Sequence, residues 1–201
     1  SVNWNEEWEK NFSPIQVGKQ CMVRAPFHEK KQVDFDIIIE PKMSFGTGHH
    51  ATTYQMIQLI LDEDWKGRKV LDMGCGTGVL GILADMKGAE DITYIDIDDW
   101  CVENTTENLV RNGVSGEVIL GGAEQIKTQF DVILANINRN ILIGDMAIYA
   151  QHLKQDGNIF FSGFYTEDLP IIQNEAQKHN LTFIKNLEKE NWIAAKFVKA
   201  N

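Results

Sequence analysis

Residues 70–81 read VLDMGCGTGVLG, in which an apolar run ending at Met73 leads into glycines at alternate positions. Glycine lets the backbone turn sharply, and it lets a ligand approach without meeting a Cβ atom. A helix that begins just after such a turn points its unpaired N–H groups at the same place. The stretch therefore predicts a buried strand, a tight ligand-binding turn and a helix, which together begin an α/β fold.

Two known glycine patterns fit this turn. In one, GTGVLG at residues 76–81 is the dinucleotide fingerprint, and Asp96 lies about 20 residues further on for a ribose hydroxyl. In the other, DMGCGTG at residues 72–78 is the signature of Rossmann-like methyltransferases, which bind S-adenosylmethionine. Both patterns place a nucleoside at the turn.

The position of the glycines relative to the strand favours the methyltransferase pattern. The dinucleotide fingerprint expects its first glycine at the strand end, whereas Gly74 and Cys75 intervene here before Gly76. In the methyltransferase register Gly74 forms the turn, and Asp72 can hold the amino-acid moiety of the cofactor, directly or through water. A pyrophosphate would repel that carboxylate. In both registers Asp96 can accept hydrogen bonds from ribose hydroxyls.

Composition and charge set the class of protein. The 201 residues are 43% apolar and 24% charged, which is typical of one globular domain with an extension. A net charge of −10 argues against direct nucleic-acid binding, which needs a basic surface. Three cysteines without metal-ligand spacing indicate a reducing compartment. Without a signal peptide or a long apolar span, we expect a cytoplasmic protein that does not bind a membrane.

From residue 41 onward, apolar β-rich runs alternate with helical patterns, which predicts a mostly parallel sheet with helices on both faces. The expected helices cover residues 51–62, 79–87, 99–112, 141–152 and 168–179. The expected strands cover residues 69–73, 92–97, 117–120, 130–136, 158–161, 183–188 and 192–199. The last two strands are joined by a tight turn, so the sheet should end in an antiparallel hairpin.

The N-terminal part, residues 1–40, has a different sequence pattern. Aromatic residues at helical spacing before Pro14 predict a short docking helix. Residues 21–27 and 35–40 are candidate strands on either side of a charged turn, which predicts a β-hairpin. We therefore divide the chain into a linker helix and β-hairpin extension at residues 1–40 and a methyltransferase domain at residues 41–201.

A second glycine-rich stretch, PKMSFGTGHHATT, precedes the first strand of the predicted sheet. Thr52 or Thr53 could simply cap the helix that follows, but a glycine-rich loop at this position is better explained as a lid over a ligand. The adjacent His49 and His50 cannot share one face, and no third ligand lies nearby. We therefore predict no metal site.

The stretch DVILANINRN carries the fourth strand of the predicted domain into Asn136. A carboxamide at this strand end lies beside the reactive end of the cofactor, where it can accept a hydrogen bond from an incoming amine. An Asx turn or a cap for the next helix explains the asparagines equally well.

The blocks FGTGHHATT, LDMGCGTGVLGILA, IDID and ILANI, in that order and spacing, resemble the PrmA family, which methylates a large-subunit ribosomal protein. The resemblance implies a class I methyltransferase fold and S-adenosylmethionine as cofactor. The cofactor contacts that it implies are Thr53, Gly74, Asp96 and Asn136. Phe45 would close over the transferred methyl group. Family members also carry an N-terminal recognition domain, which we expect this chain to lack.

These observations predict a protein N-methyltransferase that acts on lysine ε-amino groups, N-terminal α-amino groups, or both, of a large-subunit ribosomal protein. Asn136 would position the amine, with no general base assigned and solvent as the proton acceptor. The motif expected of amide methylators is replaced by residues 136–139, NINR, which favours amines. The alternatives are an NAD-linked oxidoreductase and a cofactor-binding fragment that is inactive without its recognition domain.

Overall fold

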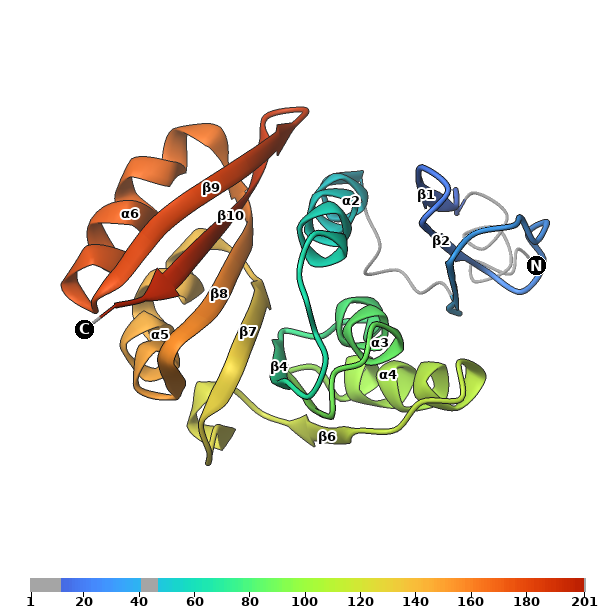
Figure 1. Ribbon diagram of the computed structural model, residues 1–201, viewed down its shortest axis with the longest axis horizontal. Helices are drawn as coiled ribbons and strands as arrows, with labels where there is room; N and C mark the ends of the chain where they lie inside the picture. Colours follow the sequence, from blue (N-terminus) through green and yellow to red (C-terminus); the bar gives the residue numbers. More distant parts are fainter. Residues whose placement is uncertain (1–11, 41–46, 201) are drawn as a thin grey trace, which may run out of the picture.

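The computed structural model describes residues 12–40 and 47–200. The docking helix expected before Pro14 and the predicted lid residue Phe45 lie outside the described residues. The described chain forms a large twisted sheet flanked by helices, with a smaller sheet beside one helical layer (Figure 1).

The large sheet has seven strands in an order that reverses near its middle. In space, they are β6 (Glu117–Leu120), β5 (Asp91–Asp96), β4 (Lys69–Met73), β7 (Phe130–Asn136), β8 (Leu153–Tyr165), β10 (Trp192–Lys199) and β9 (Leu181–Lys189). The pairings from β6 through β8 are parallel, while β10 runs antiparallel to both β8 and β9. The order reverses between β4 and β7. Open α/β sheets bind ligands outside the carboxyl ends of the strands at such a reversal.

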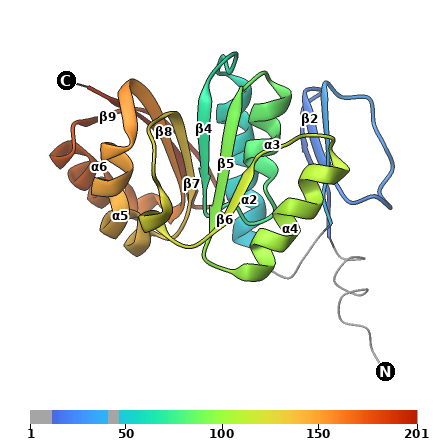
Figure 2. The ribbon, with the colours of Figure 1, turned by 90° about the horizontal axis from the view of Figure 1, so that it is seen from below.

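Helices cover both faces of this sheet, as Figure 2 shows. On one face lie α2 (Thr47–Leu61), α3 (Val79–Met86) and α4 (Asp99–Arg111), and on the other lie α5 (Arg139–Gln151) and α6 (Leu169–Lys178). Side chains alternate along β7, so Leu134 packs with the α2 layer and Ala135 with the α5 layer. The predicted α/β sheet, with helices on both faces and an antiparallel C-terminal hairpin, is confirmed.

The strand β8 is much longer than the predicted strand at residues 158–161. It continues because β7 and β10 pair with it on its two sides. Gly163 adopts φ +96 and bulges out of the ladder opposite the register shift between Ile193 and Ala194. Gly163, which lies beyond the end of the predicted strand, is therefore a bulge within a longer strand.

The small sheet contains β1 (Ile15–Val17), β2 (Cys21–Arg24) and β3 (Phe35–Ile38). Its topology contradicts the predicted hairpin between residues 21–27 and 35–40, because β2 pairs with β3 in parallel and its antiparallel partner is β1. The strand β2 ends at Arg24, which leaves residues 25–34 to carry the chain back to the start of β2, as a parallel pair requires. Arg24 forms an ion pair with Asp36 of β3 at 2.9 Å, which helps to fix this register.

Amide side chains of α4 and of its C-cap residue attach the small sheet to the large one. Asn112 accepts a hydrogen bond from Ile38 N and donates one to Ile38 O, while Asn108 Oδ1 accepts one from Glu40 N. Buried residues of all three small strands also join the core under α2 and α3. The division at residue 41 stays a prediction, although the described part of the extension packs as one body with the larger sheet.

Within the described ranges, none of the helices is long and apolar enough to cross a membrane.

Candidate active site

A cavity of about 550 Å³ lies at the carboxyl ends of β4, β5, β6 and β7, where the strand order reverses. Four predicted site residues from three strand ends line it: Gly74, Gly76, Asp96 and Asn136. The fold therefore brings together residues that are up to 62 positions apart, 136 − 74, in the sequence.

The glycine loop after β4 has a backbone that only glycine adopts easily. Gly74 and Gly76 have φ of +72 and +59, in the left-handed region. The N–H groups of Gly74 and Cys75 both donate to Ile95 O of β5, at 2.8 and 3.0 Å. A Cβ atom added at Gly74 would lie 2.7 Å from Cγ1 of Ile137. The loop is thus held against two neighbouring strand ends with no space for a side chain at its first turn.

Two side chains of α4 support the same loop from behind. Thr105 Oγ1 donates to Gly76 O at 2.9 Å, and Asn108 Nδ2 donates to Thr77 O at 2.8 Å. These contacts satisfy loop carbonyls that would otherwise be buried without a partner. The loop conformation is therefore fixed by the protein itself.

Asp96 stands at the end of β5 with 7% of its surface exposed. Its Oδ2 accepts a hydrogen bond from Gly76 N at 2.9 Å, and its Oδ1 accepts one from Asp98 N at 3.0 Å. Each carboxylate oxygen can accept a second hydrogen bond, so the group can still receive two hydroxyls. This fixed orientation toward the cavity suits the vicinal hydroxyls of a ribose.

Asp72 occupies a different position from the one expected of a cofactor contact. It is 1% exposed, lies beneath the glycine loop and does not border the cavity. Its Oδ2 accepts a hydrogen bond from Gly81 N, in the first turn of α3, at 3.0 Å. Burial raises the pKa of Asp72 to about 7, the charge of Asp96 adds to this effect, and the hydrogen bond from Gly81 opposes it. Asp72 therefore anchors the helix start, and its contact with the cofactor stays a prediction.

The two remaining predicted contacts are Thr53 and Phe45. Thr53 is buried within α2 and is not among the residues that line the cavity. Phe45 lies outside the described residues. The roles of both in cofactor binding stay predictions from the family resemblance.

The structure separates the two functions that the sequence left open for the asparagines after β7. Asn138 is the N-cap of α5, because its side chain accepts a hydrogen bond from Ile141 N at 3.1 Å. Asn136 instead ends β7 and borders the cavity. The capping role thus belongs to Asn138, and the Asn136 carboxamide is available to a ligand.

The apolar part of the lining was not predicted from the sequence. Ile97 follows Asp96 with 75% of its surface exposed, and Ile141 of α5 is 45% exposed. Both border the cavity, as do Gly121 and Gly122 after β6. Apolar side chains and a close backbone suit a flat nucleobase. The signals in the sequence were an isoleucine among aspartates and a glycine pair directly after a strand.

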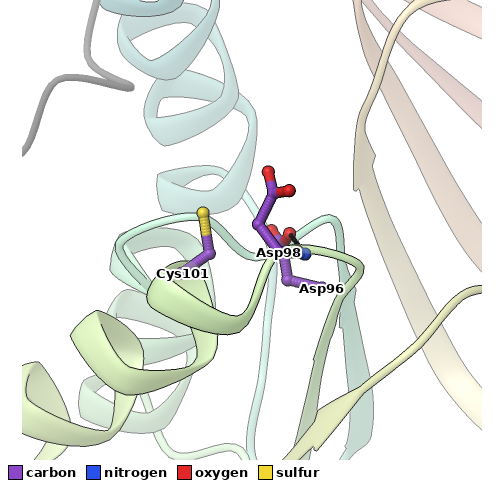
Figure 3. Close-up of side chains that lie close together, drawn as sticks. All are labelled: Asp96, Asp98 and Cys101. Carbon is purple, nitrogen blue, oxygen red and sulfur yellow. Dashed lines mark hydrogen bonds between the residues drawn. The ribbon is translucent and has the colours of Figure 1, made fainter.

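One group of potential metal ligands gathers in the described part of the chain, where atoms of Asp96, Asp98 and Cys101 lie within 4.8 Å of one another (Figure 3). Burial, together with the charge of Asp96, raises the pKa of the Cys101 thiol to about 12. A protonated thiol is a poor metal ligand. All three residues border the same cavity, so we assign the group to the nucleoside site.

The reversed sheet, the left-handed glycine loop, the acid at the end of β5 and the amide at the end of β7 define a Rossmann-like class I methyltransferase. The residues around the cavity fit the nucleoside of S-adenosylmethionine, because Asp96 offers hydroxyl acceptors and the glycine loop leaves space for close approach. The chain belongs to the family described as ribosomal protein L11 methyltransferase (PrmA), whose model matches residues 1–200. It is therefore a methyltransferase, with S-adenosylmethionine as methyl donor, and the oxidoreductase alternative is not retained.

Known relatives agree with this membership. The ribosomal protein L11 methyltransferase of Bacteroides fragilis is 50% identical over 201 residues, which cover 98% of this chain and 72% of the relative. The corresponding protein of Porphyromonas gingivalis is 49% identical, with 98% of this chain and 69% of the relative covered. The crystal structure of the ribosomal protein L11 methylase of Lactobacillus delbrueckii subsp. bulgaricus superposes with a TM-score of 0.86 at 24% identity, covering 94% of this chain and 99% of that one.

Proposed function

We propose that this chain transfers methyl groups from S-adenosylmethionine to amino groups of a large-subunit ribosomal protein. The acceptors are lysine ε-amino groups, N-terminal α-amino groups, or both. The observation that carries the amine chemistry is Asn136, which borders the cavity and is free of the capping role that Asn138 fulfils.

The relatives support the choice of acceptor protein. They are named ribosomal protein L11 methyltransferases, and they are 49–50% identical to this chain. The net charge of −10 suits a basic ribosomal protein. The prediction of a cytoplasmic protein agrees with such an acceptor. Its support within this chain is that Cys21, Cys75 and Cys101 are all free thiols.

The transfer is an in-line displacement. The lone pair of a neutral amine forms the new N–C bond while the C–S bond of the sulfonium breaks, and the electron pair of that bond stays on sulfur. The products are S-adenosylhomocysteine and a methylated ammonium, which releases a proton to solvent. Because a free lysine has a pKa near 10.4, it must lose a proton before it attacks. The protein contributes mainly by positioning the two reactants.

The proposal is tested by replacing Asn136 with alanine and following radiolabelled methyl transfer to ribosomal protein L11. We expect kcat to fall by about 10-fold or more, because the amine loses an orienting hydrogen bond, while cofactor affinity in calorimetry changes by less than about threefold. Asn138→Ala is the matched control. It removes a helix cap, so it should lower stability by about 1 kcal/mol and leave the transfer step intact.

Two results would contradict the proposal. Equal losses of turnover and cofactor affinity in Asn136→Ala would assign this residue to cofactor binding alone. Cofactor binding without any transfer to the ribosomal protein would favour the alternative of a fragment that is inactive without a recognition domain. Mass spectrometry of the methylated product would then identify which amines are modified.

A further inference from the structure

A buried hydroxyl group lies next to Asn136. Ser162 of β8 is the register partner of Asn136 of β7. The preceding pairs are Leu134 with Phe160, both in the core under α2, and Ala135 with Phe161, both in the core under α5. Side chains alternate along parallel strands, so Asn136 and Ser162 project on the α2 side of the sheet, one strand spacing apart.

The Ser162 hydroxyl has no hydrogen-bond partner among the described residues. The side chain is 0% exposed, and its Oγ is buried. Burial of a hydroxyl without a partner opposes folding, and alanine would fit the same position at no such cost. A serine is therefore poorly suited to this position unless another molecule completes its hydrogen bonding.

The backbone next to Ser162 also approaches the Asn136 carboxamide. A Cβ atom added at Gly163 would lie 3.1 Å from Asn136 Oδ1 and 2.8 Å from Ile137 O. The absence of a Cβ at Gly163 therefore lets the backbone of β8 lie close to the Asn136 amide oxygen, where any side chain would clash. Asn136 thus borders the cavity, and the buried Ser162 hydroxyl lies beside it on the neighbouring strand, on the same face of the sheet.

The geometry points to Ser162 as the second acceptor for the substrate amine, beside Asn136, an inference that rests on the proposed function and extends it. A neutral primary amine has two N–H groups and one lone pair. When the carboxamide oxygen and the hydroxyl oxygen each accept one N–H, the lone pair is left to face the sulfonium methyl. One acceptor would leave the amine free to rotate away from the line of attack.

The number of N–H groups gives this inference a specific signature. A primary amine uses both acceptors, a monomethylated amine has one N–H, and a dimethylated amine has none. Loss of the Ser162 hydroxyl should therefore slow the first transfer more than any later transfer. A purely structural role for Ser162 would slow all transfers alike.

The test compares Ser162→Ala with Tyr94→Phe in the 201-residue chain. Tyr94 OH is also buried without a partner, but it lies in the middle of β5 against Gly81, away from the strand ends. Both variants remove one unpartnered hydroxyl and should melt at or above the wild-type temperature. We expect Ser162→Ala to lower kcat for the first methyl transfer to ribosomal protein L11 by roughly 3- to 10-fold, the value of one neutral hydrogen bond. Affinity for S-adenosylmethionine in calorimetry should stay within about twofold, and Tyr94→Phe should retain wild-type turnover.

Several outcomes would overturn the assignment. First-transfer rates within twofold of wild type in Ser162→Ala would refute it while the proposed function stands. A parallel loss of cofactor affinity, or an equal slowing of every transfer in the time course of mono-, di- and trimethylated products, would show a structural role. Absence of transfer by the wild-type chain would remove the proposed function, and this inference with it.

Discussion

The two halves of the site differ in how their polar groups are satisfied. At the ends of β4 and β5, the chain pairs its own groups, because Asp96 accepts from Gly76 and Asp98, and Asp72 accepts from Gly81. At the ends of β7 and β8, the Ser162 hydroxyl is buried without a partner in the described structure. The first half is built before the cofactor arrives, whereas the second requires a ligand to complete it.

This difference reflects the two ligands. S-adenosylmethionine is the same molecule in every turnover, so a rigid, internally bonded cradle can be complementary to it without reorganisation. The acceptor amine changes at each transfer as it exchanges N–H groups for methyl groups. Hydrogen-bond acceptors of the protein bind the amine only while it still has N–H groups. Such groups suit a substrate that loses N–H groups at each transfer.

The strongest test of the preformed half is Asp96→Ala. The substitution removes the acceptor of the ribose hydroxyls and of two backbone N–H groups, so we expect the affinity for S-adenosylmethionine to fall by about 100-fold or more. Calorimetry measures this loss. Asp99→Ala, which removes an acid from the exposed start of α4, is the control and should leave affinity nearly unchanged. Similar losses in both variants would mean that net charge, not the hydrogen bonds of Asp96, controls binding.

A second test concerns the rigid turn itself. Gly74→Ala imposes a left-handed conformation on alanine and places its Cβ 2.7 Å from Ile137, so we expect a loss of about 2–4 kcal/mol in unfolding free energy. Gly113→Ala carries the same backbone strain, with φ +65, but no atom lies within 4 Å of the new Cβ. It should cost only about 1 kcal/mol in denaturant unfolding. Equal costs would show that the turn tolerates a side chain, contrary to a fixed cradle.

A third test concerns the pH dependence of the stability that Asp72 contributes. Its folded pKa, about 7, lies above the value near 3.9 of an unfolded aspartate, so the folded state retains the proton between these values. The stability that Asp72 contributes is thus complete below about pH 4 and is lost as pH rises through about 7. Relative to Asp72→Asn, the wild type should lose on the order of 4 kcal/mol between pH 4 and 8 in denaturant unfolding. A constant difference across that range would show that the carboxylate stays charged in the folded protein.

Much of the preformed half of the site, at the ends of β4 and β5, could be predicted from the sequence. The residues that specify it are close neighbours along the chain. Alternate glycines specify the turn, and Asp96 ends a run of apolar residues, so both residues could be placed at strand ends before any pairing was known. The helices and strands after residue 50 follow from periodicity in the same way, with β4, β6, β7 and β10 at their predicted limits. Local backbone preferences are enough for these features.

Other features depend on contacts between distant residues, which no single segment specifies. The length of β8 comes from pairing on both sides, and the parallel pairing of β2 with β3 comes from the path of residues 25–34. The burial of Asp72 beneath the glycine loop could not be predicted from the sequence either.

The sequence by itself determined the kind of fold, the glycine turn and the acid and amide that follow two strands. Only the tertiary structure decided that Asn138 caps a helix while Asn136 faces the cavity, and that a buried serine of β8 lies beside that amide. The reason is physical: conformational preference is carried by each residue and its neighbours, whereas burial and hydrogen-bond partnership exist only after the sheet has brought separate strand ends together.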